Sequence, residues 1–273
     1  MLVRPIGETN RTDAMGCYPL FSCQDWKRLG EDLTELGRDC VSLVLVADPF
    51  APLTEADLRQ RFDLVAPFKQ HFVAELSQAT RDFVAGDRYR RARTTLRRMT
   101  VEVAESANSG WIDDWMALQS ELDSRHVLLG MRRLSREATA RLFETPGVVI
   151  FRAILDGVTA GMHVDFIDGD RAYAHLAAYS AAGYRANIST ALYVFEIDFL
   201  RGRVDRIDWG GVAGLADDHR NGLGLFKACF SNARVTAYLC GKIFDRRAYD
   251  AMAQRRGSFD ASYFPAYRAG ERM

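Results

Sequence analysis

The chain has 273 residues, of which 48% are hydrophobic and 26% charged, and its 36 basic and 36 acidic side chains give a formal net charge of zero. This composition is typical of a soluble globular protein with a buried core, and the global charge gives no sign of a nucleic-acid partner. The longest apolar run, VSLVLVA at 41–47, is too short to span a bilayer, so no membrane contact is predicted.

The cysteines and histidines show no pattern of a metal site. No C-x-x-C or H-E-x-x-H motif occurs, so we predict no bound metal. The N-terminus carries no apolar leader, and the odd number of irregularly spaced cysteines is typical of reduced thiols. We therefore expect a cytoplasmic protein. The cysteines are at 17, 23, 40, 229 and 240, and the histidines at 71, 126, 163, 175 and 219.

The first hundred residues contain two strand candidates and one basic helix. CVSLVLVA at 40–47 is typical of a buried strand, and FKQHFVAEL at 68–76 has the alternation of another. Residues 87–98, DRYRRARTTLRR, hold six arginines in the eleven residues 88–98, with Tyr89, Ala92, Leu96 and Met99 on the apolar stripe. Like charges at this spacing repel one another, so an anionic partner such as phosphate is favoured over a solvated face.

The later residues give a clearer pattern of alternating helices and strands. Helical segments are predicted at 111–129 and 135–144, before three strands at 147–155, 158–167 and 171–180 whose Asp-Gly turns predict an antiparallel meander. An amphipathic helix at 187–202, a strand at 203–210, a helix at 222–232 and a strand at 234–244 follow.

Lys227 stands beside the apolar stripe of the helix at 222–232. Leu223, Phe226 and Phe230 form that stripe, and Lys227 is adjacent to it. Two interpretations are open: a surface lysine whose stem covers apolar surface, or a cation directed into a site.

The order of elements and three short strings resemble a known family. The meander followed by helix, strand, helix and strand is similar to the second half of the N-acetyltransferase-type (GNAT) fold. FKQHFVAEL followed by the basic helix, DWGGVAG at 208–214 and GLGLFKACF at 222–230 resemble, in the same order, strings of its Fem-like branch, which includes aminoacyl-tRNA-dependent peptidyl transferases.

The resemblance implies roles for particular residues. It places Phe226 and Lys227 at the aminoacylated 3′ end of tRNA, with Lys227 as the cation near the developing oxyanion of the attacked ester. Asp208 is implied as a general base or amine-positioning carboxylate, although an aspartate before glycines is also a common turn residue. The arginines of the basic helix are implied in tRNA binding: Arg88, Arg90, Arg91, Arg93, Arg97 and Arg98.

Four further residues are candidates for binding the acceptor. Lys69 and His71 share one side of the predicted strand at 68–76, and a polar outer face explains them as well as acceptor recognition does. Trp209 follows Asp208, and His175 lies on the strand next to His163 and Asp165. For this last group a core or cleft histidine is favoured over acid–base work.

The segment before the helix at 187–202 bears on the donor. GNAT enzymes that use acetyl-CoA normally carry a glycine-rich Q/R-x-x-G-x-G/A loop there, where backbone N–H groups approach a pyrophosphate. YRANISTA at 184–191 contains no glycine. This departure favours aminoacyl-tRNA as co-substrate, with no bound cofactor, and leaves acetyl-CoA as the alternative.

Together these features predict an α/β protein with a mixed, splayed GNAT-like sheet flanked by helices. We expect an abbreviated GNAT-like domain at 1–105, a complete one at 106–245, and a helix and tail at 246–273 that pack on the N-terminal part. The expected function is amide-bond formation, moving an amino acid from aminoacyl-tRNA to the amine of a small peptide or metabolite, as in the biosynthesis of antibiotics and other natural products. The alternatives are an acyl-CoA-dependent N-acyltransferase and a non-catalytic protein that binds RNA or another anion.

Overall fold

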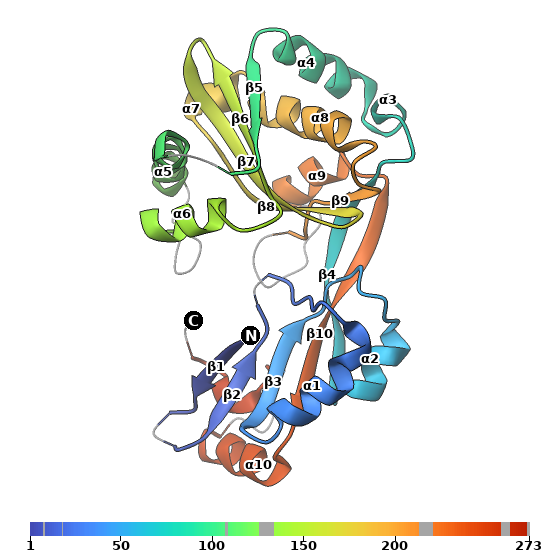
Figure 1. The fold of residues 1–273 in the computed structure, drawn as a ribbon, viewed down its shortest axis with the longest axis vertical. Coiled ribbons are helices and arrows are strands. Elements are labelled where there is room, and N and C mark those ends of the chain that lie inside the picture. Colours follow the sequence, from blue (N-terminus) through green and yellow to red (C-terminus); the bar gives the residue numbers. More distant parts are fainter. Residues whose placement is uncertain are drawn as a thin grey trace. The chain divides into compact units, whose positions relative to one another are not determined.

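The structure is a computed structural model that describes residues 1–7, 9–17, 19–106, 109–125, 134–212, 221–257 and 263–271. The chain divides into two compact units (Figure 1). The first comprises Met1–Gln70 and Val235–Met273, and the second comprises His71–Arg234. Strands β4 (Leu64–Glu75) and β10 (Ala233–Ile243) contribute residues to both units.

The first unit contains a mixed sheet with the strand order β1-β2-β3-β10-β4. Strand β1 (Leu2–Pro5) pairs antiparallel with β2 (Thr12–Met15), which pairs parallel with β3 (Cys40–Val46), and β3 is antiparallel to β10. Its helical segments are η1 (Trp26–Arg28), α1 (Leu29–Leu36), α2 (Glu55–Arg61), α10 (Arg246–Arg255) and η3 (Ala266–Arg268).

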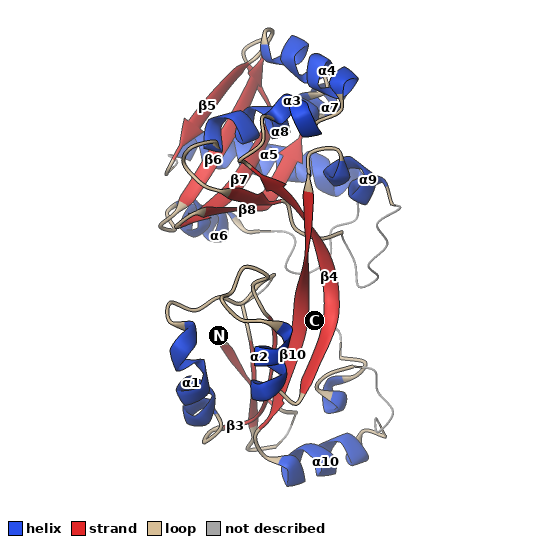
Figure 2. Cartoon of the chain, turned by 90° about the vertical axis from the view of Figure 1, so that its right-hand side faces the viewer, coloured by secondary structure: helices blue, strands red, loops and turns tan. Residues whose placement is uncertain are grey.

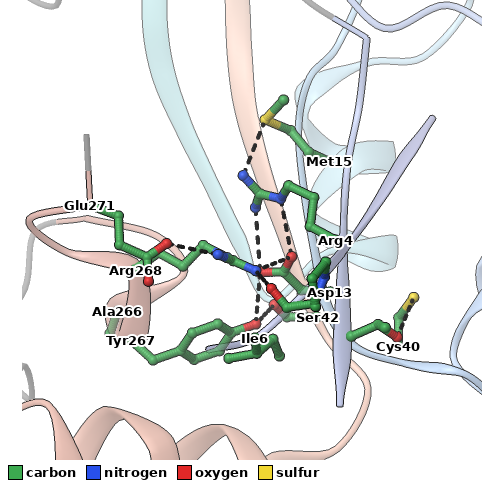
Figure 3. Close-up of polar contacts among 12 residues, drawn as sticks. Arg4, Ile6, Asp13, Met15, Cys40, Ser42, Ala266, Tyr267, Arg268 and Glu271 are labelled. Atoms are coloured by element: carbon green, nitrogen blue, oxygen red, sulfur yellow. Dashed lines mark hydrogen bonds and ion pairs between the residues drawn. The ribbon is translucent and has the colours of Figure 1, made fainter. Parts of the chain in front are cut away.

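A buried ion pair joins the last residues of the chain to the first strands. Asp13 on β2 is 0% exposed, and its Oδ2 accepts a hydrogen bond from Nε of Arg268 at 2.6 Å (Figure 3). The guanidinium of Arg4 donates to Oδ1 of Asp13 at 3.1 Å, and the hydroxyl of Tyr267 donates to Oδ2 at 3.1 Å. Because the carboxylate is fully desolvated, each of these donors is needed to offset the cost of its burial.

The second unit contains a six-stranded sheet with the order β4-β9-β8-β7-β6-β5. Its centre is the antiparallel meander, and the short strand β9 pairs parallel with β8 and antiparallel with β4. The strands are β5 (Thr100–Ala104), β6 (Val148–Leu155), β7 (Val158–Asp168), β8 (Arg171–Tyr179) and β9 (Arg206–Asp208).

Helices cover both faces of this second sheet (Figures 1 and 2). One face packs against α5 (Ser109–Arg125) and α6 (Arg136–Phe143) through a core that includes Trp115 and Met162. The other face packs against α8 (Ile188–Leu200), with α4 (Gly86–Leu96) and α9 (Gly222–Ala228) beside it. The short helices α3 (Thr80–Phe83) and α7 (Ala181–Arg185) precede α4 and α8.

The elements predicted from residue 111 onward are present, and several of them are shorter than predicted; residues 126–129 of the helix predicted at 111–129 lie outside the described residues. Strand β9 has three residues where 203–210 was predicted, and α9 ends at Ala228 rather than 232. In the first hundred residues the sequence prediction missed the short strands β1 and β2 and the helices α1, α2 and α3. Short elements carry too few periodic positions to be distinguished from loops.

The boundaries between the two units follow Gln70 and Arg234, whereas the sequence patterns predicted domain boundaries after residues 105 and 245. Residues 71–105 belong to the second unit, because α4 packs on α8 and β5 pairs with β6. The segment from α10 onward belongs to the first unit, where Tyr249, Met252 and Tyr267 form a core cluster with Ile6 and Val41. None of the described helices is long and apolar enough to cross a membrane.

We expect Asp13→Asn to lower the free energy of unfolding of the first unit by about 3–5 kcal/mol, because it removes the fully buried charge partner of Arg268 and Arg4 and leaves Arg268 with only the partly exposed Glu271. Urea unfolding followed by hydrogen exchange at residues 12–15 and 266–268 measures this loss. The control is Glu31→Gln, which removes an exposed ion pair with Arg28 and is expected to cost under about 1 kcal/mol. Equal losses for the two variants would contradict the role assigned to Asp13.

Candidate functional site

The pairing of β4 with β9 brings His71 and Asp208 together. Val73 lies opposite Asp208 in the antiparallel register, and the amide of Trp209 donates to the carbonyl of Phe72 at 2.9 Å. His71 and Val73 are two residues apart on β4 and therefore share a face. The ring nitrogen Nδ1 of His71 lies 2.8 Å from Oδ2 of Asp208, and both side chains are buried.

The second carboxylate oxygen of Asp208 is also occupied. Oδ1 accepts a hydrogen bond of 2.7 Å from the backbone N–H of Gly210. Gly210 has a φ of +73°, a left-handed conformation that glycine adopts without strain. The carboxylate thus holds both the imidazole and the turn after β9, so Asp208 acts as a turn residue and as a histidine partner at once.

Lys227 reaches the same turn from α9. Its Nζ donates to the carbonyl of Gly211 at 2.7 Å. Loss of hydration lowers the pKa of Lys227 to about 8, and the negative charge of Asp208 opposes this shift. Part of the side chain is still exposed, so the ammonium is desolvated without being sealed in the core. This placement favours the site interpretation of Lys227 over the surface interpretation.

Helix α9 begins at a local capping signal. The side chain of Asn221 accepts a hydrogen bond from the amide of Gly224 at 2.8 Å, which satisfies one of the free amides of the first turn. The helix then places Phe226 half-buried and Phe230 fully buried, with their ring centres 5.0 Å apart. Lys227 is therefore anchored by the aromatic residues on either side of it.

Trp209 lies inside the protein. It is 1% exposed, its indole Nε1 donates to the carbonyl of Phe230 at 2.9 Å, and its ring lies 4.4 Å from that of Tyr193. Tyr193 also contacts Phe226, at 5.1 Å. The prediction that Trp209 contacts an acceptor directly does not fit this burial, because the indole ring packs the core beneath α9 instead.

The structure places His175 on the sheet face opposite to α8, and Lys69 on β4 within the first unit. His175 packs against Phe166, on the sheet face covered by α5 and α6, because alternate residues of a strand point to opposite faces. Loss of hydration lowers its pKa. Lys69 is buried, lies 5.8 Å from the ring centre of Phe68, and is grouped with the first unit. The role of both in acceptor binding stays a prediction.

The six arginines of the basic helix take separate positions around α4. Arg90, Arg91 and Arg98 line a hollow of about 490 Å³, which also contains Arg185 and Asn187 at the start of α8. The hydroxyl of Thr95 donates to the carbonyl of Ala186 at 3.1 Å, which holds α4 against that turn. Within the described part of the chain, these four guanidinium groups have no acidic partner, and Asp87 is the only acid that lines the hollow.

The other three arginines of the basic segment at 87–98 do not line this hollow. Arg88 lies 5.9 Å from the ring centres of both Phe226 and Phe230, so it joins α4 to the helix that carries Lys227. Arg93 lies 3.7 Å from Asp198 of α8, and Arg97 donates to Thr94 at 3.4 Å.

A second polar cluster is buried beneath α8. His163 Nδ1 lies 2.5 Å from Oε1 of Glu196, and Asp165 shares the same face of β7, although neither carboxyl group has a well-formed hydrogen bond within the described residues. Burial lowers the pKa of His163 to about 4 and raises the pKa values of Asp165 and Glu196 well above their usual range. A buried, neutral histidine fits the core interpretation.

Glu196 is a buried acid of α8 that the sequence patterns did not predict as a polar partner of His163. Its position four residues after Leu192, on the buried side of α8, is the signal that could have found it. No group of three or more histidine, cysteine or acidic residues among those the structure describes is arranged to hold a metal ion.

Comparisons with known proteins identify the fold. Neither a protein-family profile nor a curated protein matches the chain. Among solved structures, FemX is similar over 91% of this chain and 85% of its own, with a TM-score of 0.69 and 11% identity. The chain therefore has the fold of FemX. This confirms the α/β architecture expected from the meander and the strings around Asp208 and Lys227.

Two further solved structures share this fold. The C-terminal DUF2156 domain of an Agrobacterium fabrum protein named as a lysylphosphatidylglycerol synthetase matches 89% of this chain and 79% of its own, with a TM-score of 0.62 and 14% identity. L-PGS from Bacillus licheniformis matches 81% of this chain and 75% of its own, with a TM-score of 0.60 and 12% identity.

We expect Lys227→Met to stabilise the second unit at pH 7 by about 1–3 kcal/mol, because it removes a desolvated ammonium group whose pKa has fallen from 10.5 to about 8. A lysine whose pKa is lowered by folding destabilises the folded state at any pH below the lowered value, because its ammonium is then charged and desolvated. The difference between variant and wild type is therefore largest below pH 8 and disappears as pH rises to about 10.5. Urea unfolding at a series of pH values measures it, and a pH-independent difference would contradict the assignment.

Proposed function

We propose that this protein is an acyltransferase that forms an amide bond, moving an amino acid from aminoacyl-tRNA to the amine of a small peptide or metabolite. It would act in the cytoplasm, where charged tRNA is found, in a step of natural-product assembly. The observation that carries the proposal is the desolvated ammonium of Lys227, held at the turn after Asp208 by the carbonyl of Gly211.

The chemistry of ester aminolysis explains why such a cation is useful. Attack of an amine on an ester carbonyl places negative charge on the carbonyl oxygen, and a preorganised donor beside that oxygen contributes about 3–4 kcal/mol. Lys227 is a charged donor in surroundings from which water is partly excluded, so its interaction with the oxyanion is stronger than in bulk water. The ester is already activated, and no covalent enzyme intermediate is required.

The hollow beside α4 supports a donor that carries phosphate groups. Arg90, Arg91, Arg98 and Arg185 converge there without acidic partners among the described residues, and guanidinium groups bind phosphate oxygens in pairs. Arg88 contacts Phe226, next to Lys227, and so connects this basic surface with the helix of the candidate site. An RNA backbone that follows α4 would thus be directed toward Lys227.

The same hollow is the observation in favour of the second candidate, an acyl-CoA-dependent N-acyltransferase. It lies at the turn into α8, and the first amides of a 13-residue helix carry partial positive charge. The pyrophosphate of CoA is an alternative ligand for these groups. Saturable binding of acetyl-CoA, with transfer of its acyl group to an amine, would identify this activity.

Purified protein supplied with charged tRNA and an amine acceptor is expected to form the amide, and uncharged tRNA is expected to give no product. Lys227→Met should lower kcat by about 100- to 1,000-fold, because it removes the donor to the oxyanion. The control is Lys27→Met, at an exposed position of the first unit. Product formation that survives complete hydrolysis of the tRNA ester would exclude this donor, and near-normal turnover of the Lys227 variant would exclude the oxyanion role.

We expect the double variant Arg90→Glu/Arg91→Glu to weaken tRNA binding and to reduce the slope of log Kd against log salt concentration by about 2, since each lost phosphate contact removes about one unit. Lys27→Glu/Arg28→Glu changes the net charge equally at exposed positions outside α4 and serves as the control. Fluorescence anisotropy over a salt series measures both variants. Unchanged binding would remove α4 from the RNA interface, and tight binding without turnover in the wild type would favour the non-catalytic alternative.

A further inference from the structure

Aminolysis also requires a group that takes a proton from the attacking amine, and Asp208 is not free to do so. Its Oδ1 accepts from the amide of Gly210 at 2.7 Å and its Oδ2 faces Nδ1 of His71 at 2.8 Å. A carboxylate with both oxygens engaged in this way is a good positioning group, because its acceptor sites are already in use.

We propose that His71 is the general base of the amide-forming step and that Asp208 is its positioning residue. This inference rests on the proposed function and assigns the proton transfer within it. The contact with Asp208 orients the ring and places the imidazole proton on Nδ1, because an ionised carboxylate accepts hydrogen bonds and does not donate them.

The other ring nitrogen of His71 is then the proton acceptor. Nε2 has no hydrogen-bond partner among the residues that the structure describes, and the His71 side chain is 8% exposed. Imidazole is the side chain that takes up and releases protons most readily near neutral pH. A carboxylate holding Nδ1–H while Nε2 faces the reacting group is a recurring arrangement for proton transfer in acyl-transfer sites.

Competing bases in the second unit are less suitable. Asp165 and Glu196 are 1% and 0% exposed, so a substrate amine cannot reach them. His175 packs on the opposite face of the sheet, beside Phe166. Lys227 is a further candidate, but it cannot stabilise an oxyanion once it has lost its own proton.

His71 and Lys227 together account for each proton transfer and charge change in the reaction. The amine nitrogen attacks the ester carbonyl carbon, a C–N bond forms, and the amine proton moves to Nε2 of His71. Lys227 stabilises the negative carbonyl oxygen of the tetrahedral intermediate. When the C–O bond to the ribose breaks, the protonated His71 returns its proton to the leaving ribose oxygen, which regenerates the neutral imidazole.

His71→Asn is the decisive variant, because the asparagine amide can still donate to Asp208 but has no basic nitrogen. We expect kcat to fall by about 100- to 10,000-fold, with KM within threefold of wild type and without loss of tRNA binding. Gln70→Asn, at the adjacent exposed position of β4, is the control. Added imidazole is expected to restore part of the activity of His71→Gly. Retention of a third or more of wild-type kcat by His71→Asn would overturn the proposal.

A second measurement does not depend on turnover or on the folding of a variant. Nitrogen-15 NMR of the histidine-labelled wild-type protein is expected to show the proton of His71 on Nδ1, and a proton on Nε2 would overturn the proposal. An active wild type with an active His71→Asn variant defeats this inference and leaves the proposed function standing. A wild type that transfers no amino acid from charged tRNA to any amine defeats the proposed function itself.

Discussion

The hydrogen bonding between β4 and β9 is the constraint on which the candidate site depends. Because β9 has only three residues, its position is set by pairing with β4 on one side and with β8 on the other. The carboxylate of Asp208 at its end holds both the ring of His71 and the amide of Gly210, and Lys227 donates to the carbonyl of the following residue. One buried carboxylate therefore organises three elements that come from distant parts of the chain.

Both units contain buried charge, with different consequences. In the first unit Asp13 is surrounded by Arg4, Tyr267 and Arg268, so the charge is compensated and the pairing joins the end of the chain to its beginning. In the second unit Lys227 is desolvated, and its partners among the described residues are the carbonyl of Gly211 and the more distant charge of Asp208. Incomplete compensation of this kind costs stability and is typical of a group that acts on a substrate.

Sequence patterns predicted the centre of the second unit well and its periphery poorly. The alternation of 147–180, with its Asp-Gly turns, predicted β6, β7 and β8, and the 3.6-residue period predicted α8. The roles of single residues were harder to predict. Trp209 follows the aspartate of the site but is a core residue, and His175 belongs to the opposite face of the sheet from α8. A sequence pattern gives the spacing of side chains along a strand or helix. It does not show which helices or strands pack against each face of that element.

The sequence by itself determined which local elements form and which side chains can do chemistry. A strand or helix is specified by the period of its own apolar residues, and Lys227, Asp208 and His71 are recognisable from their immediate neighbours. Only the tertiary structure decided that His71 meets Asp208, 137 residues away, and that Arg185 joins three arginines of the basic segment at 87–98. These contacts depend on strand register and helix packing. Both are determined by how the whole core is buried, so no single segment of the sequence predicts them.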